Sequence, residues 1–422
     1  MKVIKDSFLL VFTKMQMVVC CFLTLLIVFI IPTIISAQYG PPPDPSIKGN
    51  FMLNGYERKY LVYLPKSYTN TSNMPVVIHL HKNLEMTFGS GENAWIWHGK
   101  KVADEYGYIY VFPDADRRNY GLWRLDGLED VEFIDALIDT LNSNYSIDLK
   151  RIYVVGVQYG GHFCFKLACQ LSDRIAAIAP VAGLMPTALQ NDCYPLRPVP
   201  IIMMNGTDDT FVPYEGKEPA EGRRGFLSAE ESIKYWANIN ACTECDTLSL
   251  PDIDIWDHST VEKITYSKGD ANSSAVLYKV INGGHAFPGV EFIGHQFFYG
   301  ICNRDINGDV EIWNFFKDYE LPDDVIHVES DSNSPSGFSL SQNYPNPFNT
   351  ATTIEYSVPC VCRSSLNFYN ASGQLVTTLK NDINSSGRYS AVWDATGMPS
   401  GLYFYTLQSG DFVQTNKMLF LK

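Results

Sequence analysis

The strongest constraint on the fold is a regular alternation of short apolar runs and amphipathic stretches between Phe51 and Tyr319. The runs 75–80 and 152–155 are almost continuously apolar, as strands buried on both faces of a parallel sheet are. Asp130 to Leu141 places its apolar residues on one helical face. This alternation predicts an α/β fold with a mostly parallel central sheet. The expected strands are 60–64, 75–80, 108–112, 152–155, 175–182 and 200–204, and the expected helices are 92–106, 130–141, 159–171, 229–238 and 310–319.

The composition changes after this region. Residues 321–337 are rich in Asp, Ser and Pro and show no periodicity, which indicates a linker. Beyond them, segments 352–358, 365–369, 388–393 and 402–407 alternate apolar and polar residues between turn pairs such as Ser372-Gly373, which predicts a small all-β sandwich. The expected organisation is a signal peptide at 1–37, an N-terminal linker at 38–47, the α/β domain at 48–320, a second linker at 321–337 and the sandwich at 338–422.

The first 37 residues have the pattern of a signal peptide. Lys2 and Lys5 precede an apolar run from about Met17 to Ile35, and small residues suited to cleavage end at Ala37. The run is long enough to span a membrane, so an uncleaved anchor is the alternative. A proline-rich stretch follows at once and favours cleavage. We therefore expect a secreted, extracellular or cell-surface protein with no stable membrane span after cleavage.

Charge narrows the choice of partner. The formal net charge of the 422 residues is -14, and no cluster of Lys and Arg follows the first residues. Nucleic acids and anionic membrane surfaces both require a basic patch, so neither is expected as a partner.

The cysteines are expected to form disulfides. Ten are present, and Cys20 and Cys21 lie in the predicted signal peptide, which leaves eight in an oxidising environment. The sequence does not choose among their pairings. Cys242 and Cys245 have the C-x-x-C spacing of a zinc or redox site, but no second pair or paired His accompanies them. We expect no metal and no cofactor.

A candidate catalytic motif follows the strand at 152–155. The segment Gly156-Val157-Gln158-Tyr159-Gly160-Gly161 leads into a helix, and G-x-S-x-G between a strand and a helix is the nucleophile elbow of serine hydrolases. The spacing and glycines fit, but Gln158 occupies the serine position. An acid and then a histidine must follow in chain order. Asp209 and His285 stand where the acid and the base belong.

On these motifs the main domain resembles the secreted α/β-hydrolase esterases of the polyhydroxybutyrate-depolymerase and feruloyl-esterase family. The segments that carry the resemblance are 151–161, 167–169, 173–183, 206–214, 284–289 and 305–316. The resemblance as a whole covers about Lys48 to Tyr319, the whole main domain. The resemblance implies an α/β-hydrolase fold and serine-type hydrolysis of carboxylic esters. Position by position, it implies Asp209 as the triad acid, His285 as the base and Gln158 as a substituted nucleophile.

The family's oxyanion loop is altered as well. In the family, the strand ending at Leu80 leads into His-Gly and a glycine-rich loop, whereas this chain reads His81-Lys82-Asn83-Leu84. The resemblance places His81, Lys82 and Tyr159, the residue after the nucleophile position, in the oxyanion region. A non-glycine backbone can still donate an N–H, but losing the glycines changes the loop.

Together the two departures predict a hydrolase fold whose catalysis is lost or strongly reduced. Removing a triad serine costs about 10⁶ in rate, and disturbing the oxyanion hole costs roughly a further 10² to 10³. Two alternatives stay open: an active carboxylic ester hydrolase that uses an altered route, and a non-catalytic protein that binds a polysaccharide or polyester in the inherited cleft. Asp209 and His285 could also be a structural hydrogen bond between two loops. The expected ligand is a polymeric or small ester.

The C-terminal segment resembles the sorting domain of the type IX secretion system. The resemblance rests on Gln342-Asn343-Tyr344-Pro345-Asn346-Pro347-Phe348-Asn349, on Gly401-Leu402-Tyr403-Phe404-Tyr405 and on the end Lys417 to Lys422. It implies export through the type IX machinery, with residues 338–422 as the contact. A carbohydrate-binding or spacer sandwich is the alternative.

Three weaker signals have competing explanations. Trp123, like Trp95 and Trp97, could contact a sugar or aromatic acid, and core packing is the alternative. Asp305 to Asp309 imitates the start of a calcium loop but lacks its Gly and Glu, so a helix capped by Asn307 explains it better. His162 is expected on a helix face and not as a substitute base.

Overall fold

The computed structural model describes residues 46–82, 94–221, 224–290, 299–322, 337–358, 362–384, 387–409 and 412–422. The predicted signal peptide, Asn83 and Leu84 of the altered loop, and most of the second linker lie outside these residues. Within them, the structure contains no helix with the length and apolar character needed to cross a bilayer.

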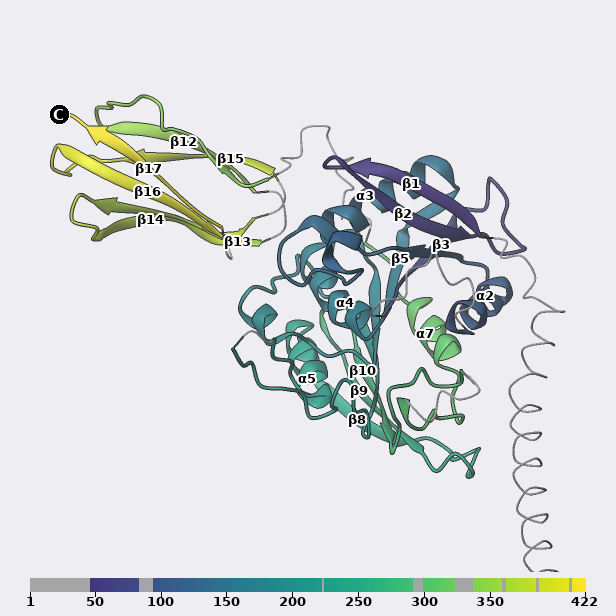
Figure 1. The fold of residues 1–422 in the computed structure, drawn as a ribbon. Helices are drawn as coiled ribbons and strands as arrows, with labels where there is room; N and C mark the ends of the chain where they lie inside the picture. The colour runs from purple at the N-terminus through teal and green to yellow at the C-terminus, as the bar shows by residue number, and fades with distance from the viewer. Residues whose placement is uncertain are drawn as a thin grey trace, which may run out of the picture. The chain divides into compact units, whose positions relative to one another are not determined.

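The described part of the main domain contains a ten-stranded sheet with the order β1-β2-β4-β3-β5-β6-β7-β10-β9-β8 (Figure 1). The strands are β1 (Ile47–Leu53), β2 (Tyr56–Tyr63), β3 (Met74–Leu80), β4 (Ile109–Pro113), β5 (Ile147–Val157), β6 (Ala177–Val181), β7 (Ile201–Gly206), β8 (Glu244–Ser249), β9 (Thr260–Ser267) and β10 (Ala275–Ile281). The central strands β4, β3, β5, β6, β7 and β10 pair in parallel, and antiparallel strands flank them. This arrangement is the α/β-hydrolase fold and confirms the predicted class.

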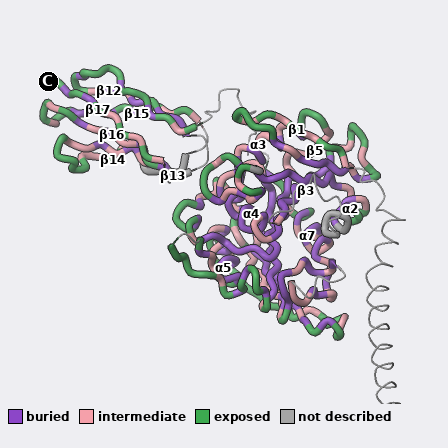
Figure 2. Tube along the Cα trace, in the orientation of Figure 1, coloured by how far each residue is buried: buried purple, intermediate pink, exposed green. Residues whose placement is uncertain are grey.

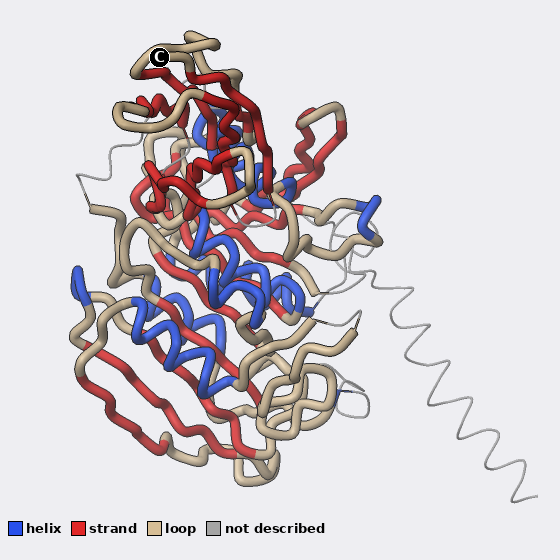
Figure 3. The backbone as a smooth tube through the Cα atoms, turned by 90° about the vertical axis from the view of Figure 1, so that its left-hand side faces the viewer, coloured by secondary structure: helices blue, strands red, loops and turns tan. Residues whose placement is uncertain are grey.

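Helices cover both faces of this sheet, so the core has two layers. One face packs against α3 (Glu129–Asn144), α4 (Tyr159–Gln170) and α5 (Ala229–Ile239). The other packs against α2 (Ala94–Tyr106) and α7 (Gly308–Phe316). Figure 3 shows helices in blue beside the strands in red, and Figure 2 shows buried residues concentrated where they meet. The predicted apolar face of α3 is buried, and every residue of β3 is buried.

The start of α7 explains the motif that imitates a calcium loop. Asn307 is the N-cap residue, and its side chain accepts a hydrogen bond from the backbone N–H of Val310 at 3.2 Å. The carboxylate of Asp305 accepts hydrogen bonds from the backbone N–H groups of Ile253 and Asp254. The predicted helix cap is confirmed.

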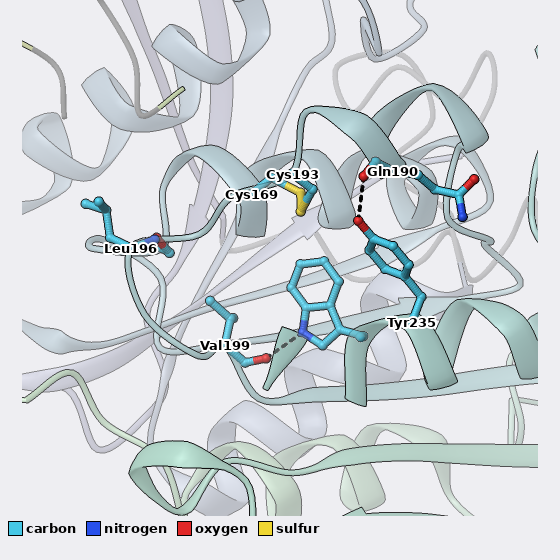
Figure 4. Close-up of a disulfide and its surroundings, with 8 residues drawn as sticks. Cys169, Gln190, Cys193, Leu196, Val199 and Tyr235 are labelled. Atoms are coloured by element: carbon cyan, nitrogen blue, oxygen red, sulfur yellow. Dashed lines mark hydrogen bonds between the residues drawn. A yellow bond between two sulfur atoms is a disulfide. The ribbon is translucent and has the colours of Figure 1, made fainter. Parts of the chain in front are cut away.

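One disulfide joins Cys169, at the end of α4, to Cys193 in the segment before β7 (Figure 4). Nearby, Tyr235 of α5 donates its hydroxyl to the carbonyl oxygen of Gln190 at 2.7 Å. The disulfide therefore fastens a surface segment to the helices of one face. Cys164, Cys242, Cys245 and Cys302 are free thiols.

Replacing Cys193 with Ser is expected to destabilise the protein. The disulfide joins residues 24 positions apart, and a loop of that size corresponds to about 3 to 4 kcal/mol of unfolding free energy in the chain-entropy description. Guanidinium unfolding under non-reducing conditions measures the loss. Cys245→Ser is the control because Cys245 is an exposed free thiol, and its effect should stay within about 0.5 kcal/mol. Equal losses in both variants would contradict a stabilising role for the disulfide.

The C-terminal domain is a two-sheet sandwich. In its described residues, one sheet has the order β11-β12-β15 and the other β14-β13-β16-β17. The strands are β11 (Ser339–Leu340), β12 (Ala351–Val358), β13 (Cys362–Asn370), β14 (Leu375–Asn384), β15 (Gly387–Asp394), β16 (Gly401–Ser409) and β17 (Phe412–Phe420). All four predicted strands are present, and β11, β14 and β17 were not foreseen.

The residues behind the sorting-domain resemblance hold this sandwich together. Asn343 is buried, and its side-chain amide donates to Thr352 at 2.9 Å and to the carbonyl oxygen of Pro345 at 3.1 Å. Phe348 lies in the core and forms a bridge with Phe420 near the chain end. The first and last motifs of the domain therefore meet in space.

Candidate active site

The elbow keeps its tight geometry although serine is absent. Gln158 lies between β5 and α4 with φ 53° and ψ -109°, a region that L-residues rarely occupy and that costs about 1 to 3 kcal/mol. A Cβ on Gly156 would lie 2.2 Å from the carbonyl oxygen of Gly160, and one on Gly160 would lie 2.2 Å from that of Leu80. The glycines are therefore required by the close approach of α4 to the strands. The chain retains a strained presentation of residue 158.

The structure brings Asp209 and His285 together. The loop after β7 carries Asp209, and the turn after β10 carries His285. His285 donates its Nδ1–H to Oδ2 of Asp209 over 2.7 Å, since a carboxylate only accepts. Oδ1 of Asp209 accepts the backbone N–H groups of Phe211 and Val212, each at 2.8 Å. Both side chains are buried, so the pair is held from two sides.

The other ring nitrogen of His285 is available. Its Nε2 is buried and has no hydrogen-bond partner among the described residues. The rings of Phe211 and Tyr299 lie 5.1 and 6.0 Å from the imidazole, centroid to centroid. With the proton on Nδ1, Nε2 is an acceptor, as a general base requires. Neither aromatic neighbour was predicted from the sequence. Phe211 lies two residues after Asp209 and could have been found from that position, whereas no sequence signal marks Tyr299.

A pocket of about 890 Å³ opens at the elbow. Its lining residues are Gln158, Tyr159, His162, Leu184, Thr210, Phe211, Val212, Pro213, Gly216, Lys217, Ala220, Arg224 and Phe226. Its volume is typical of ligand sites. His285 does not itself line the pocket, but Phe211 does and also packs against its ring. The contribution of residues 210–220, Arg224 and Phe226 to the pocket wall was not foreseen from the sequence.

The predicted oxyanion region is only partly described. Nε2 of His81 accepts a hydrogen bond from the backbone N–H of Ala115 at 3.0 Å. Nδ1 of the same ring lies 2.7 Å from the carbonyl oxygen of Lys82. These contacts place the ring proton on Nδ1, where it is donated to Lys82. The Nζ of Lys82 lies 4.7 Å from the ring centroid of Tyr299. His81 therefore holds the end of β3, and its side chain is occupied by backbone groups.

Trp123 lies in the core. It is 1% exposed, its ring stacks on Phe163 with centroids 5.3 Å apart, and its Nε1–H donates to the carbonyl oxygen of His81 at 3.0 Å. Of the two roles open for Trp123, this position matches core packing and not contact with a substrate. Its indole hydrogen bond fixes the backbone just after the end of β3.

Neither nearby alternative group suits catalysis. Burial lowers the pKa of His162 to about 4, so its ring is neutral at ordinary pH, and its Nδ1 lies 2.7 Å from the carbonyl oxygen of Leu184. Burial also raises the pKa of the Cys164 thiol well above its usual value. A protonated, buried thiol is a poor nucleophile. In the described residues, no group of three or more His, Cys, Asp and Glu side chains is placed to hold a metal ion.

Both domains are similar to known proteins. Residues 342–421 match the family described as the secretion system C-terminal sorting domain. Feruloyl esterase B of Piromyces equi is 28% identical over 63% of this chain and 46% of its own length. The bifunctional acetylxylan esterase/xylanase XynS20E of Neocallimastix patriciarum is 29% identical over 63% of this chain and 34% of its own length. The chain thus spans less than half the length of these two relatives.

A solved acetyl xylan esterase from Aspergillus awamori is 13% identical, with a TM-score of 0.44 over 64% of this chain and 99% of that structure. The sequence relatives of the main domain are esterases, and the C-terminal domain identifies a secreted or cell-surface protein. The chain therefore combines an α/β-hydrolase domain that is similar to feruloyl and acetylxylan esterases with a secretion system C-terminal sorting domain.

Proposed function

We propose that this protein is a secreted, esterase-like binding protein whose hydrolytic activity is lost or strongly reduced. Gln158 at the nucleophile position is the observation that carries the proposal. The ligand is an ester-bearing polymer whose ester group enters the pocket at the elbow. Residues 338–422 pass the chain to the type IX secretion machinery.

The chemistry of glutamine supports the loss of activity. Its amide has no proton whose removal by His285 would create a useful nucleophile, so no covalent ester intermediate can form at residue 158. Loss of the serine accounts for about a 10⁶-fold reduction in rate. The glycines missing after His81 supply a second, smaller loss through the oxyanion hole. The remaining rate lies close to that of uncatalysed hydrolysis.

The pocket supports binding. It has the size of a ligand site, and Gln158 presents one acceptor and two donors at its edge. An ester carbonyl accepts hydrogen bonds, so the amide can hold the group that a serine would attack. The names of two relatives, feruloyl esterase and acetylxylan esterase, favour a polysaccharide that carries ester groups, such as acetylxylan.

A second candidate function rests on the Asp209–His285 pair. Its hydrogen bond is intact, and Nε2 of His285 has no partner in the described part of the chain. Such a base could activate a water molecule that attacks an ester directly, without a covalent intermediate. This route makes the protein a slow hydrolase.

Turnover by the wild-type chain separates the two functions. We expect no hydrolysis of p-nitrophenyl acetate or methyl ferulate above that of His285→Ala, measured as release of p-nitrophenol or ferulic acid. In the variant, Asp209 keeps its two backbone donors, and circular dichroism checks that it folds. Clear turnover that His285→Ala abolishes would contradict the binding-protein proposal and support the slow hydrolase.

A further inference from the structure

The loop between β8 and β9 presents large apolar side chains to solvent. Ile253, Ile255 and Trp256 are 73%, 60% and 77% exposed. Scattered single apolar residues on a surface are ordinary, but three within four positions form a patch. Such patches on soluble proteins mark binding sites. Neither the elbow pocket nor the core accounts for this one.

Hydrogen bonds hold the loop in place. The carboxylate of Asp305 accepts the backbone N–H groups of Ile253 and Asp254 at 2.7 and 2.9 Å. The side chain of Asp254 pairs with Arg304 at 2.8 Å. Asp257 is buried and accepts the backbone N–H of Arg304 at 2.7 Å. The apolar side chains are therefore displayed from an ordered backbone, which reduces the entropy lost on binding.

The loop lies beside the turn that carries His285. Strand β9 pairs with β10 so that Thr260 lies opposite Ile281, and Figure 1 shows β8, β9 and β10 side by side. The side chain of Asn282 donates to the carbonyl oxygen of His258 at 3.1 Å. Asn282 belongs to the turn that carries His285. The apolar loop therefore lies at the same sheet edge as the acid–base pair, one strand further along.

We propose that Ile253, Ile255 and Trp256 form an accessory platform that binds the main chain of a neutral polysaccharide while its ester group occupies the elbow pocket. The inference rests on the proposed function, because when an ester attached to a polymer enters the pocket, the adjoining part of the polymer must lie on the protein surface. The flat apolar face of a sugar ring can stack on the exposed indole.

The charge of the protein selects the kind of polymer. Asp252 is exposed in the loop, Asp254 is paired with Arg304, and the net charge of the chain is -14. A polyanionic chain would be repelled from such a surface. A neutral xylan-type chain meets no such repulsion, and its hydroxyl groups can donate to the exposed carboxylate of Asp252. We therefore assign the platform to a neutral polysaccharide.

Affinity electrophoresis of the full exported chain in soluble, de-esterified xylan tests the platform. Trp256→Ala should weaken xylan binding about tenfold, because the variant lacks the indole face on which a sugar ring stacks. Trp256→Phe should retain most of the affinity. Met52→Ala, an exposed apolar residue at the opposite end of the sheet on β1, should change nothing. These residues lie on the surface, so the variants should fold normally.

The outcomes distinguish this inference from the proposed function. De-esterified xylan tests the platform alone, whereas calorimetric titration with methyl ferulate tests the pocket alone. Weaker xylan binding by Trp256→Ala with unchanged ferulate binding supports the platform. Wild-type binding of xylan without ferulate binding would sink only the pocket proposal. The platform is overturned if wild type does not bind xylan, if Trp256→Ala binds as wild type does, or if the chain binds polyhydroxybutyrate granules in place of xylan.

Discussion

Gln158→Ser is expected to raise ester hydrolysis by about 10³- to 10⁴-fold over the wild-type chain. A missing triad serine costs about 10⁶ in rate, and an imperfect oxyanion hole removes roughly 10² to 10³ of what the restored serine returns. Release of p-nitrophenol from p-nitrophenyl acetate and of ferulic acid from methyl ferulate measures the gain.

The expected gain in rate depends on the backbone geometry that the elbow retains. Residue 158 still has φ 53° and ψ -109°, and the glycines on either side still let α4 approach the sheet. A serine placed there inherits the same projection from the strand end. The Asp209–His285 hydrogen bond already orients a base. If the three positions form the predicted triad, one side chain separates the chain from its complete form.

Gln158→Ala is the matched control for this gain. It removes the amide and opens the pocket as serine does, but it supplies no hydroxyl. Equal gains from alanine and serine would show that the amide blocks a water-based reaction, which contradicts the nucleophile explanation. Adding His285→Ala to Gln158→Ser should abolish the gain. If serine restores nothing in a folded protein, the changed loop after His81 becomes the cause.

Most of the parallel centre of the fold was predictable because burial leaves a clear sequence pattern, although β10 was not foreseen. β3, β4 and β6 are buried along their whole length, so they read as short apolar runs. α3 is amphipathic for the same reason, since one side faces the sheet. The candidate triad positions were predictable because elbow, acid and base follow one another in a fixed chain order.

The outer strands and the pocket wall left weaker signals. β8 is exposed along its whole length, so its sequence shows no alternation that would mark a strand. Partner choice for Cys169 depends on where the segment before β7 lies, and that position is set by tertiary packing. The role of Trp123 was left open for the same reason. The sequence around an aromatic residue near a site looks the same whether the side chain packs into the core or faces the ligand.

Arg58→Met is expected to lower the free energy of unfolding by about 3 to 5 kcal/mol. Arg58 of β2 and Asp130 of α3 form an ion pair at 2.6 Å, and their side chains are 5% and 0% exposed. Methionine would leave the Asp130 carboxylate buried without its charged partner, and among the described residues it would keep a hydrogen bond from the backbone N–H of Arg124. Guanidinium unfolding followed by tryptophan fluorescence measures the loss.

Lys66→Met is the matched control for this loss. Lys66 pairs with Asp104 at 2.9 Å, but its side chain is 86% exposed. Asp104 also keeps hydrogen bonds from the Tyr63 hydroxyl and the Lys66 backbone N–H. An exposed pair contributes about 0 to 1 kcal/mol, because water solvates both charges when the pair breaks. Similar losses of unfolding free energy in the two variants would mean that burial does not determine the cost of breaking the ion pair. A loss confined to Arg58→Met would show that desolvation of Asp130 makes this pair necessary for joining β2 to α3.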